Sequence, residues 1–228
     1  MSVAVLSGSG SDVVGEEFVK EIELSVARRQ ATLYAAYGKR VLDFVGALVL
    51  LLLVVPVLLI AAAAVRLTGP GVLFRQRRAG YGGSQFTIYK FRTMRPDRRC
   101  GTRPFDGPDR RSRHKCRTDP RITGPGRVLR ALSLDELPQL VNVLRGEMSL
   151  VGPRPELPEI VAGYAPWQHA RHAVKPGLTG PWQVSHRHKV LMHEATALDL
   201  DYVAGVSLGT DLALLARTVP ALLLHRGF

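Results

Sequence analysis

The feature that most constrains this sequence is an uncharged, apolar run of about 22 residues from Phe44 to Val65. A helix of this length can cross the hydrocarbon core of a bilayer, and uncharged runs this long are rare in the cores of soluble proteins. A buried helix of a soluble protein is the alternative, but we favour a membrane helix. The run begins too far into the chain to belong to a cleavable signal peptide.

Basic residues lie on both sides of this run, with Lys39 and Arg40 before it and Arg66 after it. Because positive residues mark the cytoplasmic side, these flanks give no preferred crossing direction and allow both ends to be cytoplasmic. Pro56, near the middle, removes one helical hydrogen bond and clashes with the carbonyl of Leu52. We therefore expect a re-entrant, proline-broken helix, with a kinked spanning helix as the alternative.

The charge of the whole chain indicates an anionic partner. A net charge of +12 and a pI near 10.4 are typical of proteins that bind nucleic acid, membrane surfaces or phosphorylated substrates. Arginines are concentrated in residues 95–117, which we interpret as a loop that associates with anionic lipid. Cys100 and Cys116 lie in the same loop and form neither a disulfide framework nor a zinc pattern, so we expect free thiols in a reducing compartment.

The rest of the chain predicts an α+β fold that is mainly helical with one β-hairpin. The hairpin consists of strand-like residues 72–78 and 85–91, joined by the turn Gly80-Tyr81-Gly82-Gly83. The segment 175–183 is rich in proline and glycine, and we expect a rigid loop without regular structure. A short basic helix or turn is expected at 119–132. Helical segments are expected at about 138–146, 156–173, 191–203 and 208–224, the last with an apolar face suited to the membrane interface.

Two adjacent carboxylates, Asp135 and Glu136, interrupt a part of the chain that is crowded with arginine. Apolar residues follow them at helical spacing and Gly146 can end that helix, so the pair is expected near a helix N-terminus. In one interpretation Ser133-x-x-Glu136 is a capping box, with Glu136 bonded back to the Ser133 backbone. In the other, the acids meet a phosphate, as a nucleophile or through a metal. These residues alone leave both interpretations open.

The rigid loop at 175–183 is a candidate for holding a nucleotide, with Trp182 or Gln183 near the base. Packing in the protein interior is the competing role for Trp182. As for organisation, we expect an N-terminal tail and peripheral helix at 1–38, the membrane helix at 39–67 and a further domain at 68–228.

A series of motifs runs from about Lys39 to the C-terminus. In chain order they are Lys39-Arg40-x-x-Asp43, Gly71-x-x-Phe-Arg-Gln-x-Arg78, Tyr89-Lys-Phe-Arg-Thr-Met94, Asp119-Pro-Arg-Ile-Thr123, Ser133-Leu-Asp-Glu-Leu-Pro-Gln-Leu140, Gly146-Glu-Met-Ser-Leu-Val-Gly-Pro-Arg-Pro155, Lys175-Pro-Gly-Leu-Thr-Gly180 and Trp182-Gln-Val184. With these motifs the chain resembles the bacterial sugar transferases, the small monotopic polyprenyl-phosphate phosphoglycosyltransferases. So many ordered motifs make the resemblance highly specific.

The resemblance implies a monotopic protein on the cytoplasmic face of the bacterial inner membrane. The implied reaction moves a phospho-sugar from a nucleotide sugar, which we expect to be UDP-linked, to polyprenyl phosphate at the first membrane step of surface polysaccharide or glycoconjugate synthesis. Asp135 is then the nucleophile, and Asp135 and Glu136 hold Mg²⁺. The same resemblance assigns phosphate binding to Lys90, Arg130 and Arg154, and the nucleotide side to Gln183 and Arg187.

Three departures from the family pattern stand out. Val55 replaces the serine that often precedes the mid-helix proline, Ser185-His186-Arg187 replaces a common Asn-Gly-Arg, and the loop at 95–117 lacks an acidic opening. The rival hypothesis is a non-catalytic, basic, membrane-anchored adaptor for lipid or nucleic acid. We expect no nucleic-acid partner, since the chain has no aromatic–basic interleaving of the kind that reads nucleic acid. The expected partners are nucleotide sugar, polyprenyl phosphate and membrane lipids, with a homodimer left open.

Overall fold

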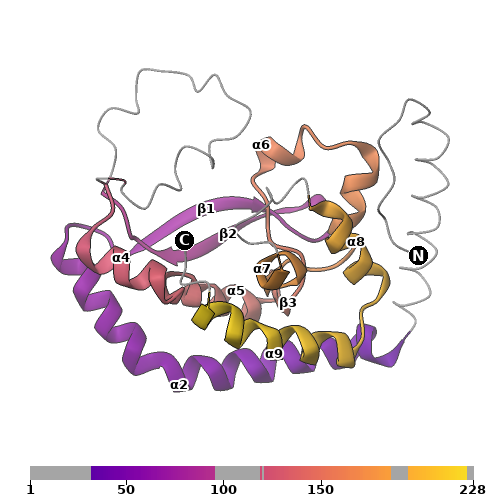
Figure 1. Cartoon of the computed structure of the whole chain (residues 1–228), viewed down its shortest axis with the longest axis horizontal. Helices are drawn as coiled ribbons and strands as arrows, with labels where there is room; N and C mark the ends of the chain where they lie inside the picture. Colours follow the sequence, from indigo (N-terminus) through magenta and orange to yellow (C-terminus); the bar gives the residue numbers. More distant parts are fainter. Residues whose placement is uncertain (1–31, 96–118, 120, 186–194, 225–228) are drawn as a thin grey trace.

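The fold is described from a computed structural model for residues 32–95, 119, 121–185 and 195–224. The fold contains two small two-stranded sheets surrounded by helices. Both sheets and these helices lie on one side of a long N-terminal helix (Figure 1). The predicted class, mainly helical with a β-hairpin, is confirmed. The predicted N-terminal tail and most of its peripheral helix, both cysteines and Arg187 lie outside the described residues.

Helix α2 (Lys39–Leu67) contains the apolar run and follows a short π-helical turn, η1 (Tyr34–Gly38). The side chains of Leu52, Leu53 and Ile60 in its middle are 65%, 72% and 71% exposed. Only 11% of the most apolar 18-residue stretch of the helix is buried. A core helix of a soluble protein would bury most of this surface, because apolar burial is what stabilises such a helix. That alternative is therefore wrong, and α2 is by length and composition able to enter a membrane.

Pro56 lies inside α2 without ending it, which corrects the expectation of a proline-broken helix. A proline removes a single helical hydrogen bond and tends to kink a helix, while the turns on either side can keep their own bonds. The helix changes direction in its middle part, and the rest of the described chain lies on its inner side (Figure 1).

Both ends of α2 are fastened to the same domain. At the N-terminal end, Asp43 is buried and accepts hydrogen bonds from the Ser149 hydroxyl at 2.9 Å and the Leu150 amide at 2.8 Å. At the C-terminal end, Arg92 donates to the carbonyls of Val65 at 3.1 Å and Gly69 at 3.0 Å. Between these ends, one face of the helix packs on the domain through Leu51 and Val54, and the other face is exposed.

The predicted hairpin is confirmed. Strands β1 (Leu73–Ala79) and β2 (Gln85–Phe91) pair antiparallel, from Leu73 opposite Phe91 to Ala79 opposite Gln85. The turn between them is the 3-10 segment η2 (Tyr81–Gly83), where Gly82 and Gly83 adopt φ values of 60° and 76°. Positive φ at consecutive positions favours glycine, which explains the glycine-rich turn.

A second, parallel sheet corrects the expectation that residues 175–183 lack regular structure. Strand β3 (Ser149–Val151) pairs with β4 (Gly177–Thr179), and helix α7 (Pro181–Ser185) follows directly. A Cβ atom added to Gly177 would lie 2.1 Å from the amide nitrogen of Gly152. The glycine that suggested a loop is therefore required for two strands to approach closely.

Helices cover these sheets and share one main core. The core contains Ile88 of β2, Leu140 and Val143, Met148, and Tyr202 and Leu214 from the C-terminal helices. The segment predicted at 156–173 forms two short helical elements instead of one helix. The remaining helical elements are α4 (Gly124–Ala131), η3 (Leu134–Gln139), α5 (Leu140–Arg145), α6 (Pro158–Val161), η4 (Pro166–Ala173), α8 (Thr196–Ala204) and α9 (Leu208–Leu224).

Candidate active site

The two adjacent carboxylates lie in η3, a 3-10 segment that leads into α5. The predicted helix is thus divided, because Pro138 has no N–H to donate within a regular α-helical ladder. Ser133 enters the segment in the left-handed conformation, with φ of 56°, and Gly146 ends α5 as predicted, with φ of 81°. Ser133 makes no side-chain capping bond, so the capping-box interpretation is wrong.

Glu136 is held by two cations. Arg154 donates from Nη1 to Oε2 at 3.0 Å and from Nη2 to Oε1 at 2.5 Å, which is the bidentate geometry that guanidinium and carboxylate groups favour. Lys90, from β2, donates to the same Oε1 at 2.9 Å. The fold therefore brings Lys90 and Arg154, both predicted to bind phosphate, into contact with Glu136, and these contacts fix the orientation of the Glu136 carboxylate.

Asp135 differs from its neighbour, because its carboxylate makes no hydrogen bond or ion pair to any residue of the described chain. Burial, and then the adjacent charge of Glu136, raise the pKa of Asp135 to about 6, although Lys90, Arg130 and Arg154 act in the opposite direction. An unbonded carboxylate with a raised pKa is the kind of group that serves as a nucleophile or a metal ligand.

The third predicted cation, Arg130, lies near the carboxylates without touching them. It comes from α4, whose first turn is capped by Thr123 accepting a 3.1 Å bond from the Gly126 amide. The Arg130 Nε donates to the Thr93 hydroxyl at 2.9 Å, which holds the side chain in place. The positive charge of Arg130 acts to lower the pKa of Asp135.

Arg171 and Asp199, which were not predicted from the sequence, support the backbone of Arg154. Arg171 donates to the carbonyl of Arg154 at 2.9 Å and to Asp199 of α8 at 2.6 Å, and it also bonds to the Tyr164 hydroxyl. The side chains of Arg171 and Asp199 are 1% and 0% exposed. No motif spacing links these two positions, so only the folded chain shows that they form a pair.

A third missed residue, Asn142, fastens α5 to the hairpin. It donates to the Thr87 carbonyl at 2.7 Å and accepts from the Tyr89 amide at 3.3 Å, and it is fully buried. Because α5 continues directly from η3, this contact sets the distance between the two carboxylates and Lys90 on β2.

Gln183 and Trp182, both in α7, have different roles. Trp182 is 5% exposed and packs against Ala195 and Leu198, so the packing interpretation of Trp182 is confirmed. Gln183 is 9% exposed, and neither its Oε1 nor its Nε2 has a hydrogen-bond partner among the described residues. It lines a cavity of about 180 Å³ that Glu136 and Arg154 also line. A buried amide without partners indicates a ligand or water at this point.

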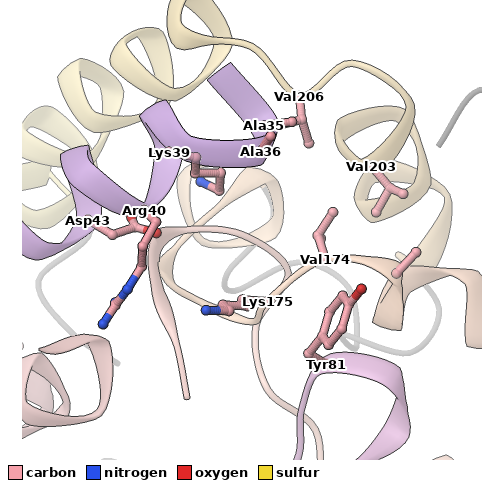
Figure 2. A pocket seen from close by; sticks show the side chains of 11 residues that line it. Ala35, Ala36, Lys39, Arg40, Asp43, Tyr81, Val174, Lys175, Val203 and Val206 are labelled. Atoms are coloured by element: carbon pink, nitrogen blue, oxygen red, sulfur yellow. The ribbon is translucent and has the colours of Figure 1, made fainter. Parts of the chain in front are cut away.

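A larger cavity, of about 450 Å³, lies at the N-terminal end of α2 and contains none of the predicted site residues. Figure 2 shows Lys175 reaching toward Arg40 across it. Arg40 donates to the carbonyls of Val143 at 2.7 Å and Leu144 at 2.8 Å, at the end of α5. The basic residues that flank the apolar run therefore also anchor it to the domain.

The described residues contain no group of three or more His, Cys, Asp or Glu side chains arranged to hold a metal ion. Mg²⁺ commonly uses only one or two carboxylates and takes its other ligands from water and substrate phosphates. Asp135, whose carboxylate has no partner within the described ranges, fits such a site. Glu136 fits less well alone, because Lys90 and Arg154 already bond to both of its oxygens.

The family resemblance implies that Asp135 is the nucleophile, and on that hypothesis its raised pKa predicts a pH dependence of the first chemical step. A nucleophilic carboxylate must be ionised, so the rate should then fall about tenfold per pH unit below about pH 6 and level off above about pH 7. The measurement is nucleoside monophosphate release between about pH 5 and 8, with circular dichroism confirming that the fold persists. A flat profile across this range would contradict the expectation.

Comparison with known proteins gives consistent matches over most of the chain. The family model described as bacterial sugar transferase matches residues 34–225. A UDP-glucose:undecaprenyl-phosphate glucose-1-phosphate transferase of Caulobacter vibrioides is 47% identical, over 81% of this chain and 69% of its own. The exopolysaccharide production protein ExoY of Rhizobium meliloti is 41% identical, over 83% of this chain and 87% of its own. An undecaprenyl-phosphate glucose phosphotransferase of Komagataeibacter xylinus is 39% identical, over 84% of this chain but 37% of its own.

Proposed function

The chain belongs to the bacterial sugar transferase family, and on that premise we propose that it transfers a phospho-sugar from a nucleotide diphosphate sugar to polyprenyl phosphate. A UDP-sugar is the proposed donor, in keeping with the UDP-glucose donor in the name of the Caulobacter relative. The observation that carries the proposal is the pair Asp135 and Glu136, in which one carboxylate is unbonded and its neighbour is held by two cations.

In the first step, an Asp135 oxygen attacks the phosphorus that carries the sugar. An oxygen–phosphorus bond to Asp135 forms, the bond to the remaining phosphate breaks, and nucleoside monophosphate leaves. Lys90, Arg130 and Arg154 surround the carboxylates and are placed to bind the phosphate oxygens, so that negative charge is neutralised as the carboxylate approaches. Rigid support of Arg154 by Arg171 keeps this charge in position.

In the second step, a phosphate oxygen of the polyprenyl phosphate attacks the same phosphorus. The bond to Asp135 breaks, the carboxylate is regenerated, and the product is polyprenyl-diphosphate-sugar. The Glu136 carboxylate, fixed by Lys90 and Arg154, holds these cations at the reacting phosphate in both steps. Gln183 is proposed as a substrate contact, and the role of Arg187 on the nucleotide side stays a prediction.

Mg²⁺ is proposed as the cofactor, held by Asp135 and Glu136 together with substrate phosphates. When bound it would neutralise the charge of the diphosphate. In the proposal, the arginines and the lysine then orient the phosphates, and the two carboxylates supply the protein ligands.

The test is a panel of nucleotide sugars with undecaprenyl phosphate in detergent micelles. We expect one or more donors to give both nucleoside monophosphate and a lipid-linked sugar diphosphate, and chelation by EDTA to stop the reaction. The Glu136→Gln variant should lower the rate and weaken the dependence on Mg²⁺ together. A protein that binds lipid but releases no nucleoside monophosphate from any donor would favour the adaptor hypothesis instead.

We also propose that α2 enters and leaves the bilayer on the cytoplasmic face of the bacterial inner membrane. Both ends of the helix contact one domain, which is difficult to reconcile with ends on opposite sides. The basic flanks are consistent with this arrangement.

This topology predicts the labelling of single cysteines in intact cells. In a background with Cys100 and Cys116 replaced by serine, a cysteine at Ser2 and one at Gly227 should both resist a membrane-impermeant thiol reagent. Both should react once the cells are opened. Labelling of one terminus in intact cells would mean that α2 spans the membrane.

A further inference from the structure

The cavity of about 180 Å³ beside Glu136 has an apolar body. It lies between α2, β4 and α9, and the side chains that form its walls are mainly aliphatic. They include Leu50 of α2, Leu178 of β4, and Leu215, Ala221 and Leu222 of α9. We call this cavity the α2–α9 groove.

The groove is continuous with the surface that α2 and α9 expose. Leu50 and Leu222 are each 37% exposed, so both belong to the wall and to the outer surface. Next to Leu50 along α2 lie the strongly exposed Leu52 and Leu53, the part of the helix suited to a membrane. With this part of α2 in the bilayer, as proposed above, an apolar chain would reach the groove along this surface without passing through water.

The other end of the groove is polar and reaches the proposed reaction centre. Glu136 and Arg154 line it, and so does Gln183, whose two buried amide atoms have no partner in the described part of the chain. The two threonines in the wall bond to each other at 2.7 Å, and Thr218 also donates to the Leu214 carbonyl. The unsatisfied hydrogen-bonding capacity of this region is therefore concentrated at Gln183.

We propose that the α2–α9 groove holds the isoprene units of the lipid acceptor nearest its phosphate, with Gln183 donating to that phosphate. This inference rests on the function proposed above. An aliphatic channel that opens toward the membrane and ends at an arginine and an unpartnered amide suits a molecule with a hydrocarbon chain and a phosphate terminus. Gln183 then contacts the acceptor, and not the nucleotide as the family resemblance implies.

The nucleotide is the competing occupant, and the groove suits it less well. Among the described residues that line the groove none is aromatic, so a base would have no ring to stack on. The volume is also below the roughly 300–1,000 Å³ typical of pockets that enclose drug-sized ligands. It is large enough only for part of a long chain.

The test separates the two half-reactions, because only the second uses the acceptor. Ala221→Phe places a ring in the groove, and Gln183→Leu removes the amide while keeping a similar volume. For each variant, nucleoside monophosphate release is measured first without acceptor, as a single-turnover burst. Turnover is then measured with undecaprenyl phosphate and with farnesyl phosphate. Val219→Phe, at a 60% exposed position of α9 outside the groove, is the matched control.

We expect both variants to keep a burst within about twofold of wild type and to lose roughly tenfold or more in kcat/KM for both acceptors. The control should match wild type in both assays. The burst also shows that each variant is folded; Ala221→Leu is a smaller second substitution if Ala221→Phe gives no protein.

Three results would overturn the inference. An equal loss in the burst and in turnover for Gln183→Leu would place Gln183 on the nucleotide side. Unchanged kcat/KM in both variants would mean that the groove does not bind the acceptor. A defect with undecaprenyl phosphate alone would point to altered contact with the micelle, since farnesyl phosphate also fills the part of the groove nearest the phosphate. If wild type gives no burst with any donor, it is the proposed function that has failed.

Discussion

Asp135→Asn is expected to abolish turnover, with a loss of about 10³-fold or more, because the substitution removes the nucleophilic charge but keeps the size of the side chain. Asp135 has no hydrogen bond or ion pair in the described part of the chain, so little structural support is lost with it. The variant should therefore fold normally, and acceptor-free release of nucleoside monophosphate should disappear together with turnover.

Intact-protein mass spectrometry gives the direct measurement. After mixing with the active nucleotide sugar and no acceptor, wild type should gain the mass of one phospho-sugar, and Asp135→Asn should gain none. Asp201→Asn, an exposed aspartate of α8, is the matched control and should behave as wild type. Full activity in Asp135→Asn would exclude Asp135 as the nucleophile.

The second large effect is expected on the stability of the fold, at the buried ion pair Arg171–Asp199 that supports Arg154. Asp199→Ala leaves the Arg171 guanidinium buried without its carboxylate, and removing one member of such a pair typically costs about 3–5 kcal/mol. Both side chains are at most 1% exposed, so water cannot replace the missing partner. For a chain of this size the loss corresponds to a fall in Tm of roughly 6–20 °C.

Thermal unfolding in detergent, followed by circular dichroism, measures this change. Asp201→Ala on the same helix should shift the Tm by no more than about 2 °C, because exposed substitutions rarely exceed about 0.5 kcal/mol. The double variant Arg171→Met with Asp199→Leu should be more stable than Asp199→Ala, since no charge remains unpaired. A single variant as stable as wild type would show that the pair does not support the site.

Local sequence patterns were sufficient wherever the signal lies within one element. The hairpin follows from alternating strand residues around a glycine turn, and the end of α5 from Gly146 in a left-handed conformation. The apolar character of α2, which makes it a candidate membrane helix, follows from its uncharged length. Asp135 and Glu136 could be singled out because adjacent carboxylates are unusual among so many arginines. In each case the determining interactions are close in the sequence, or depend on composition alone.

The tertiary structure decided the contacts between distant residues. In the sequence, Gly152 and Gly177 each suggest a loop. In the fold they are neighbours and let β3 and β4 approach closely, and the sequence does not show that these two glycines meet. Asp135 and Glu136 look equivalent in the sequence, yet folding surrounds Glu136 with Lys90 and Arg154 and leaves Asp135 unbonded. Gln183 becomes part of a groove only when α7 packs against α9. These differences depend on long-range packing and on burial, and local sequence patterns do not record either one.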